Sequence, residues 1–214
     1  MAIAVDATSS GEITSPATTT TVAHTCSGSD LVLVVATAYV DPSIVSGVTY
    51  NGSAMTKSIE RNDGDYLNCQ LWYIIDPSTG ANNIVATHTN TGTMKVFGVS
   101  LTGAKTSDPI DVTGSETNGA GTDPSLAVTT NNANSILVDV VTSPGAVYTV
   151  GASQTEIDNV LSNSHTGAAS YESGGAAGSY TMSWSEGGSN TSSHCILAVN
   201  EAPPITFTPS VIIM

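Results

Sequence analysis

The stretch Leu67-Asn-Cys-Gln-Leu-Trp-Tyr-Ile-Ile75 decides the fold class of this chain. Every second residue from Leu67 to Ile75 is apolar, and this period of two predicts a β-strand with one buried face. Two other runs, Leu31–Val35 and Ile136–Val141, are almost continuously apolar, which is typical of central strands covered on both faces. No stretch repeats apolar residues at helical spacing over three turns, so we predict an all-β protein.

Short β-branched runs recur about every ten residues and are separated by Gly, Asn, Asp, Pro and Ser. Asn51-Gly52 and Asp63-Gly64 supply the residues that a tight hairpin turn needs. This pattern predicts an antiparallel β-sandwich of the jelly-roll type. The predicted strands are Thr18–His24, Leu31–Tyr39, Gly47–Tyr50, Ala54–Ile59, Asn68–Ile75, Asn83–Thr89, Met94–Leu101, Pro109–Gly114, Ser125–Thr130, Ser135–Val141, Thr155–Val160, Ala168–Tyr171, Gly178–Ser183 and His194–Asn200.

Two pairs of segments suggest an internal duplication. In sequence, Val22–Val35 aligns with Ala127–Val140, and Val96–Ala104 aligns with His194–Ala202. We therefore predict one β-sandwich domain over 1–202, with pseudo-duplicated halves at about 10–104 and 118–202, and an extended C-terminal arm over 203–214. The halves can form two small sandwiches or interleave in one. The short linker near 114–122 favours interleaving.

Charge excludes several classes of function. The 214 residues include 4 Lys and Arg against 18 Asp and Glu, for a formal net charge of −14. So few cations cannot follow a phosphate backbone or dock on anionic lipid, so we expect no nucleic-acid or membrane partner. The N-terminus has neither the basic region nor the apolar run of a signal peptide, which predicts synthesis in a cytoplasm without general export.

A series of short motifs resembles a known family. The motifs are Ala23–Val35, Val45-x-x-Val48-Thr-Tyr-Asn-Gly-x-Ala-Met-Thr56, Leu71-Trp-Tyr73, Pro77-x-x-Gly80-x-x-Asn83-Ile-Val85, Gly98–Gly103, Asp108-Pro-Ile110, Val150–Thr155 and Ser179–Trp184. Over roughly residues 5 to 202, the chain resembles Thr/Gly-rich β-sandwich proteins encoded by tailed phages and environmental bacteria. The resemblance implies an extracellular or virion-surface structural module, and it carries over no catalytic residues.

Together with the missing signal peptide, this resemblance favours a non-enzymatic phage virion protein. We expect a capsid decoration or cement protein that assembles in the host cytoplasm and lies on the virion surface. Its expected partners are the major capsid protein and further copies of itself, in a homo-oligomer such as a trimer. The alternative is a carbohydrate-binding adhesin or tail-fibre module, and a secreted hydrolase comes third.

The side chains that could bind metal are not arranged in a recognised ligand pattern. Cys26, Cys69 and Cys195 are odd in number and lack Cys-x-x-Cys spacing, so we expect buried thiols. A zinc site would need His24, Cys26, His194 and Cys195 to converge, although neighbouring strand residues point to opposite faces. The acidic turn Asn62–Asp65 lacks the remaining ligands of a calcium loop. We therefore predict no metal and no cofactor.

The sequence also predicts no catalytic residue. It has no Gly-x-Ser-x-Gly elbow and no carboxylate pair that stands out for glycoside hydrolysis. Five aromatic residues can either line a sugar-binding face or belong to the core, and the alternation around Leu71 favours the core for at least one of them. These residues are Tyr50, Trp72, Tyr73, Tyr180 and Trp184.

The C-terminal arm differs from the rest of the chain. Pro203 and Pro204 stop strand pairing and stiffen the exit. The arm can fold back as an edge strand or cross to a neighbouring subunit, and its uncharged apolar tip favours the crossing. The predicted interface residues are Ile205, Phe207, Val211, Ile212, Ile213 and Met214.

Overall fold

A computed structural model describes residues 2–14, 17–40, 45–64, 66–89, 92–145 and 147–204. Within these ranges the chain forms strands and loops and contains no helix, which confirms the all-β prediction. None of the described elements is a helix that could span a membrane. The strands are β1 (Ala4–Thr14), β2 (Thr19–Cys26), β3 (Val32–Val40), β4 (Val45–Tyr50), β5 (Ser53–Ala54), β6 (Thr56–Asn62), β7 (Leu67–Ile75), β8 (Gly80–His88), β9 (Thr93–Thr102), β10 (Ile110–Asn118), β11 (Ser125–Thr129), β12 (Ile136–Pro144), β13 (Tyr148–Val150), β14 (Thr155–Ser162), β15 (His165–Ser173), β16 (Ser179–Glu186) and β17 (Ser192–Val199).

The strands form four antiparallel sheets. Strands β1 to β9, the N-half, make the sheets β1-β9-β3-β7-β6 and β2-β8-β4-β5. Strands β10 to β17, the C-half, make the sheets β10-β17-β12-β15-β14 and β11-β16-β13. If β5 and β6 count as one broken strand, both halves have the order 1-8-3-6-5 in the larger sheet and begin 2-7-4 in the smaller one. Each half is thus a β-sandwich with jelly-roll strand order.

The expected interleaving of the halves is wrong, because each sheet contains strands from one half alone. The halves join between β9 and β10, whereas the predicted linker at 114–122 overlaps the end of β10. Those Gly-, Ser- and Thr-rich residues have the composition of a loop, yet β10 pairs with β17 as far as Asn118. The first strand of each half begins at Ala4 and Ile110, earlier than the predicted starts near 10 and 118.

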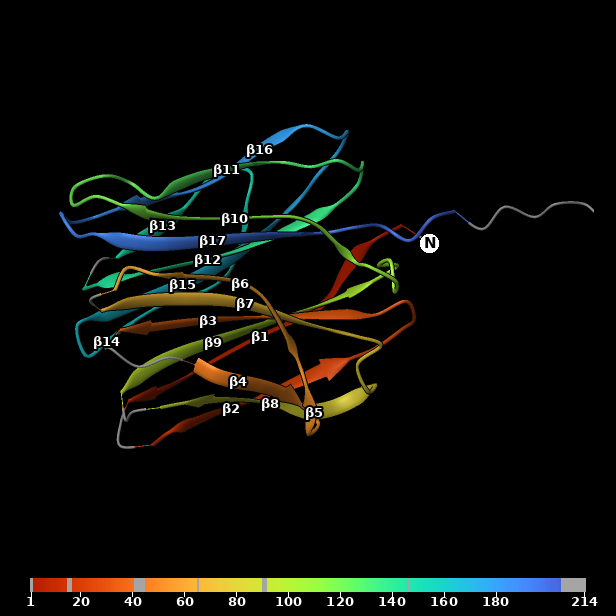
Figure 1. Cartoon of the computed structure of the whole chain (residues 1–214), viewed down its shortest axis with the longest axis horizontal. Coiled ribbons are helices and arrows are strands. Elements are labelled where there is room, and N and C mark those ends of the chain that lie inside the picture. Colours follow the sequence, from red (N-terminus) through yellow and green to blue (C-terminus); the bar gives the residue numbers. More distant parts are fainter. Residues whose placement is uncertain are drawn as a thin grey trace, which may run out of the picture.

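The four sheets stack as four layers (Figure 1). The two larger sheets pack face to face in the middle, and the smaller sheets cover their outer faces. Between the larger sheets lies a central core to which both halves contribute. Its fully buried members are Val32, Val34, Ala36, Ala38, Cys69, Leu71, Phe97, Val99, Leu101, Ala104, Ile136, Val138, Val140, Ala169, Cys195, Leu197 and Val199. Shared burial of this apolar surface holds the two sandwiches together.

Each half also has an outer core, which lies between its larger sheet and the smaller sheet that covers it. The N-half outer core is one apolar cluster that includes Leu33, Val35, Tyr50, Trp72 and Val96. The C-half outer core is divided into two smaller clusters, one around Leu126, Val128, Leu137, Met182, Ile196 and Ala198 and one around Val141, Tyr148, Ala168 and Trp184. The same strand order is therefore filled in two different ways.

Polar contacts also cross the central interface. The buried Lys95 ammonium donates to Glu12 Oε2 at 2.8 Å within the N-half and to the Ser162 hydroxyl of the C-half. Arg61 Nε donates to Thr117 Oγ1 at 2.7 Å. A Cβ on Gly167 would lie 2.7 Å from both Ala38 Cβ and Lys95 Cγ, so the absent side chain lets the two sheets approach.

Candidate functional site

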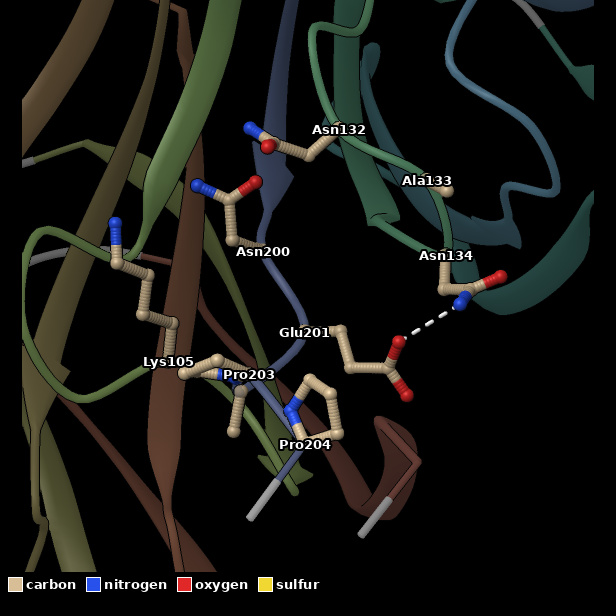
Figure 2. A pocket seen from close by; sticks show the side chains of 9 residues that line it. Lys105, Asn132, Ala133, Asn134, Asn200, Glu201, Pro203 and Pro204 are labelled. Atoms are coloured by element: carbon tan, nitrogen blue, oxygen red, sulfur yellow. Dashed lines mark hydrogen bonds between the residues drawn. The ribbon is translucent and has the colours of Figure 1, made fainter. Parts of the chain in front are cut away.

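A hollow lined by described residues lies where the chain leaves the C-half. This terminal cleft has a volume of about 350 Å³ (Figure 2). Three segments meet there: the connection between the halves, the β11–β12 turn and the residues after β17. Its lining residues are Lys105, Asn132, Ala133, Asn134, Asn200, Glu201, Ala202, Pro203 and Pro204.

Backbone hydrogen bonds fix the exit of the chain to the connection between the halves. Lys105 N donates to Asn200 O at 2.9 Å, and Ala202 N donates to Gly103 O at 2.8 Å. Ala104 and Glu201 form an isolated antiparallel bridge. The chain is thus held in pairing as far as Ala202, immediately before the two prolines.

The turn on the other side of the cleft is held by a carboxylate. Asp111 accepts hydrogen bonds from Asn131 N and from Asn132 Nδ2, both at 2.8 Å. Asn134 adopts a positive φ of 59°, which asparagine tolerates better than most residues, and its amide donates to Glu201 Oε2 at 2.7 Å. This last bond spans the cleft, as Figure 2 shows.

One polar group in the cleft is left without a partner. The Asn200 side chain is 5% exposed, and its Oδ1 has no hydrogen-bond partner within the described part of the chain. The Asn200 amide lies between the Lys105 side chain and Asn132 in Figure 2. A buried carbonyl oxygen without a partner is costly, so a ligand donor at this position would be favoured. The cleft therefore suits a small polar group that both donates and accepts hydrogen bonds.

A second cluster has the composition of a catalytic site but lacks its access. Asp139 on β12 accepts hydrogen bonds from Trp184 Nε1 at 2.7 Å and from Ser170 N at 3.0 Å, and it pairs with His194 Nε2 at 2.9 Å. Asp139 and His194 are fully buried. In the described structure His194 Nδ1 has no hydrogen-bond partner, so no serine, threonine or cysteine is bonded to it. The cluster therefore joins β12, β15, β16 and β17 and has no arrangement for nucleophilic catalysis.

The five predicted aromatic residues do not form a common sugar-binding face. Tyr50 and Trp72 are buried in the N-half outer core, and Trp184 is buried in the C-half. Tyr180 is partly buried, and its hydroxyl accepts from Gly175 N and donates to Ala176 O. Tyr73 is partly buried against the central core. The structure thus assigns these rings to packing.

The hypothetical zinc ligands are also separated. Cys26 lies in the N-half outer core, whereas Cys195 lies in the central core and faces Cys69. His24 pairs with Ser9 and His194 with Asp139. In the described ranges no group of three or more His, Cys, Asp or Glu side chains is placed to hold a metal ion.

The acidic turn is a hydrogen-bonded hairpin. Asn62 Oδ1 accepts from Gly64 N, and Asp63 Oδ1 accepts from Tyr66 N and Leu67 N. Asp65 lies outside the described residues. The predicted interface residues Ile205, Phe207, Val211, Ile212, Ile213 and Met214 also lie outside them. The structure therefore gives the exit of the C-terminal arm and not its path.

Sequence reasoning missed both the terminal cleft and the Asp139 cluster. A single Asp inside the apolar run Ile136–Val141 was a usable signal, because a carboxylate in a covered strand needs buried donors. The terminal cleft offered no comparable signal. No family model, curated protein or solved structure matches this chain.

Proposed function

We propose that this protein is a non-enzymatic phage virion component, a capsid decoration or cement protein that binds the major capsid protein as a homo-oligomer. The observation that carries the proposal is the relation between the cores and the C-terminal arm. All core clusters of the described structure are built from residues up to Val199, and pairing continues to Ala202. The apolar arm begins beyond this rigid body.

The proposed mechanism is mechanical. Two fused sandwiches form a stiff block that covers a joint between shell subunits, and the arm extends to a neighbour. Burial of each large apolar side chain is worth roughly 1.5–3 kcal/mol. Even if ordering of the arm consumes half of that, a few kcal/mol per subunit remain. Around a symmetric ring this gain decides whether the oligomer forms.

Deletion of residues 205–214 tests the role of the arm. The truncated protein should keep the melting temperature of the full chain but lose its oligomer and its binding to shells. Analytical ultracentrifugation and co-sedimentation with shells measure these two losses. A variant with Ile212→Ser and Ile213→Ser is the matched control for apolar contact at constant length. An unchanged oligomer together with unchanged shell binding would contradict the clasp.

The location on the virion needs a separate measurement. Quantitative mass spectrometry of purified virions should find the protein at a copy number of the same order as that of the major capsid protein. A few copies per particle would instead indicate a tail-fibre module. Absence from purified virions would refute both locations.

A carbohydrate-binding adhesin is the second candidate, and the terminal cleft favours it. Asn132, Asn134 and Asn200 place three amide side chains around one hollow, beside the ammonium of Lys105. Amides can donate to and accept from sugar hydroxyls. A glycan array with the full protein should then give a hit that Asn200→Ala abolishes and that Asn83→Ala, at an exposed position on strand β8 of the N-half, retains. Binding equal in both variants would exclude the cleft as the sugar site.

A further inference from the structure

Two thiols from different halves meet in the central core. Cys69 on β7 and Cys195 on β17 lie 126 residues apart in the sequence, and their Sγ atoms are 3.2 Å apart. Both side chains are fully buried. The Cys195 thiol also lies 3.5 Å from the backbone oxygen of Cys69. The facing sheets of the two sandwiches thus place a pair of sulfurs in direct contact.

The surrounding strands hold the two sulfurs in position. Cys69 pairs with Ala38 and Arg61 on the strands at its two sides. Cys195 pairs with Val140 and Ser115 in the same way. Neither backbone is at a sheet edge, so neither can withdraw easily. A disulfide bond is about 2.05 Å long, so the sulfurs have roughly 1 Å to close, within reach of small side-chain rotations.

We propose that Cys69 and Cys195 are a disulfide-forming pair that cross-links the two jelly rolls when a small oxidant such as hydrogen peroxide reaches them. One thiolate attacks a peroxide oxygen, which yields a sulfenic acid and releases one water after protonation. The second sulfur attacks the sulfenic sulfur and expels the second water. In total, two thiols and one peroxide give one disulfide and two waters, so the sulfurs lose two electrons and the protein loses two hydrogen atoms.

The closed interface makes this reaction slow and its product durable. Burial and the neighbouring thiol raise the pKa of Cys69, so the reactive thiolate is scarce while the halves stay docked. Oxidation should therefore be faster at alkaline pH or when mild denaturant loosens the interface. Once formed, the disulfide is shielded from reductants by the same packing. The inference does not depend on the proposed function.

The third thiol provides an internal control. Cys26 is buried in the N-half outer core, on the opposite face of the larger N-half sheet from Cys69. The 4 Lys and Arg residues are also spaced so that trypsin releases each cysteine on a separate peptide. Cleavage after Lys57, Arg61, Lys95 and Lys105 gives peptides 1–57, 62–95 and 106–214, which contain Cys26, Cys69 and Cys195 respectively.

Peroxide treatment of the full protein followed by non-reducing mass spectrometry tests the proposal. The intact mass should fall by two hydrogen atoms, and the digest should contain peptide 62–95 linked to peptide 106–214, released by dithiothreitol. The band should stay monomeric on a non-reducing gel, because the link is within one chain. The oxidised protein should melt roughly 5–15 °C higher than the reduced one.

Variants separate this pair from general thiol oxidation. Cys26→Ala should still form the link, whereas Cys69→Ala and Cys195→Ala should lose both the link and the gain in melting temperature. If a variant does not fold, peptide mapping of the peroxide-treated protein without substitutions remains decisive. Three free thiols after oxidation, oxygen added to Cys69 without a link, or linkage of Cys26 at equal yield would each overturn the proposal.

Discussion

The N-half and the C-half share a strand order but stabilise it with different chemistry. Strand pairing aligns their positions: Val35 opposes Gly98 and Trp72, while Asp139 opposes Ile196 and Ser170. Thus Asp139 occupies the place of Val35, and Ser170 that of Trp72. The same register places His194 at the position of Val96. Three apolar residues of the N-half outer core correspond to three polar residues in the C-half.

The buried tryptophan of each half also lies in a different sheet. In the N-half, Trp72 belongs to the larger sheet and packs outward towards the cover. In the C-half, Trp184 belongs to the cover, and its Nε1 reaches inward to Asp139. The comparison teaches that a jelly roll can close over an apolar cluster or over a satisfied polar network. The network is the more demanding solution, because Trp184, Ser170 and His194 all depend on the single carboxylate of Asp139.

The largest difference should appear when Asp139→Val copies the N-half residue into the C-half. The variant leaves the Trp184 indole, the Ser170 amide and the His194 imidazole without their acceptor. We expect a loss of about 3–5 kcal/mol in the free energy of unfolding, measured by urea denaturation.

The matched change in the N-half is Val35→Ala, which should cost about 1–3 kcal/mol through a cavity. The double variant Asp139→Val with His194→Val should recover part of the loss, because it removes one of the orphaned groups. If Asp139→Val lowers the free energy of unfolding less than Val35→Ala does, the polar network does not stabilise the C-half.

A smaller effect should follow when a methyl group is placed between the halves. Gly167→Ala puts a Cβ only 2.7 Å from Ala38 Cβ and from Lys95 Cγ, so the two larger sheets must separate or distort. We expect a loss of about 1–3 kcal/mol, seen as a lower melting temperature. Gly47→Ala is the control, since nothing lies within 4 Å of its added Cβ. Equal stability of the two variants would mean that the central interface tolerates expansion.

The halves should also differ in their response to acid. Burial and the nearby Lys95 lower the pKa of His165 in the C-half to about 3. The folded imidazole therefore stays neutral while the unfolded one gains a proton below about pH 6.5, so stability falls as pH falls. Between pH 7 and pH 5 this residue alone should remove about 2 kcal/mol.

Urea denaturation at both pH values measures this loss in the native protein and in His165→Gln. The variant should show a shallower pH dependence across this range, whatever its stability at pH 7. An unchanged slope would show that His165 is not protonated on unfolding. His24 of the N-half, whose pKa is also lowered by burial, is the corresponding comparison.

The smallest expected effect is electrostatic. Lys95→Met removes the N-half charge that helps to lower the pKa of His165 across the central interface. The pKa of His165, followed by NMR of its ring protons, should therefore rise. Lys57→Met, at an exposed position in the N-half, should leave it unchanged. A fall in the pKa of His165 in the Lys95→Met variant would contradict the assigned coupling.

The sequence predicted the strands whose apolar pattern is strong. Leu67–Ile75 and most of Ile136–Pro144 lie where the pattern placed them. It missed β1 (Ala4–Thr14), because Ser, Thr and Gly in an edge strand have the composition of a loop. The duplication was placed one residue out of register around β3, since Val32, not Leu31, corresponds to Ile136. A shift of one residue exchanges the two faces of a strand.

The terminal cleft could not be predicted from the sequence, for a different reason. Lys105, Asn132 and Asn200 are ordinary loop and strand-end residues in the sequence, and only the fold brings their segments together. The pairing of Cys69 with Cys195 likewise depends on how two complete sandwiches face each other. Local patterns describe one strand at a time, and these sites belong to the packing between strands.

The positions of the two chain ends have a topological consequence. Ala2 lines small hollows together with Glu201, Ala202 and Pro204, so the first and last described segments lie side by side at one end of the molecule (Figure 1). The connection between the halves passes the same end through Lys105. A circular permutant that joins residue 204 to residue 2 by a short linker and opens the chain near Thr106 would therefore keep every strand. In that molecule the C-half would come first along the chain. The two halves would keep the same arrangement in space.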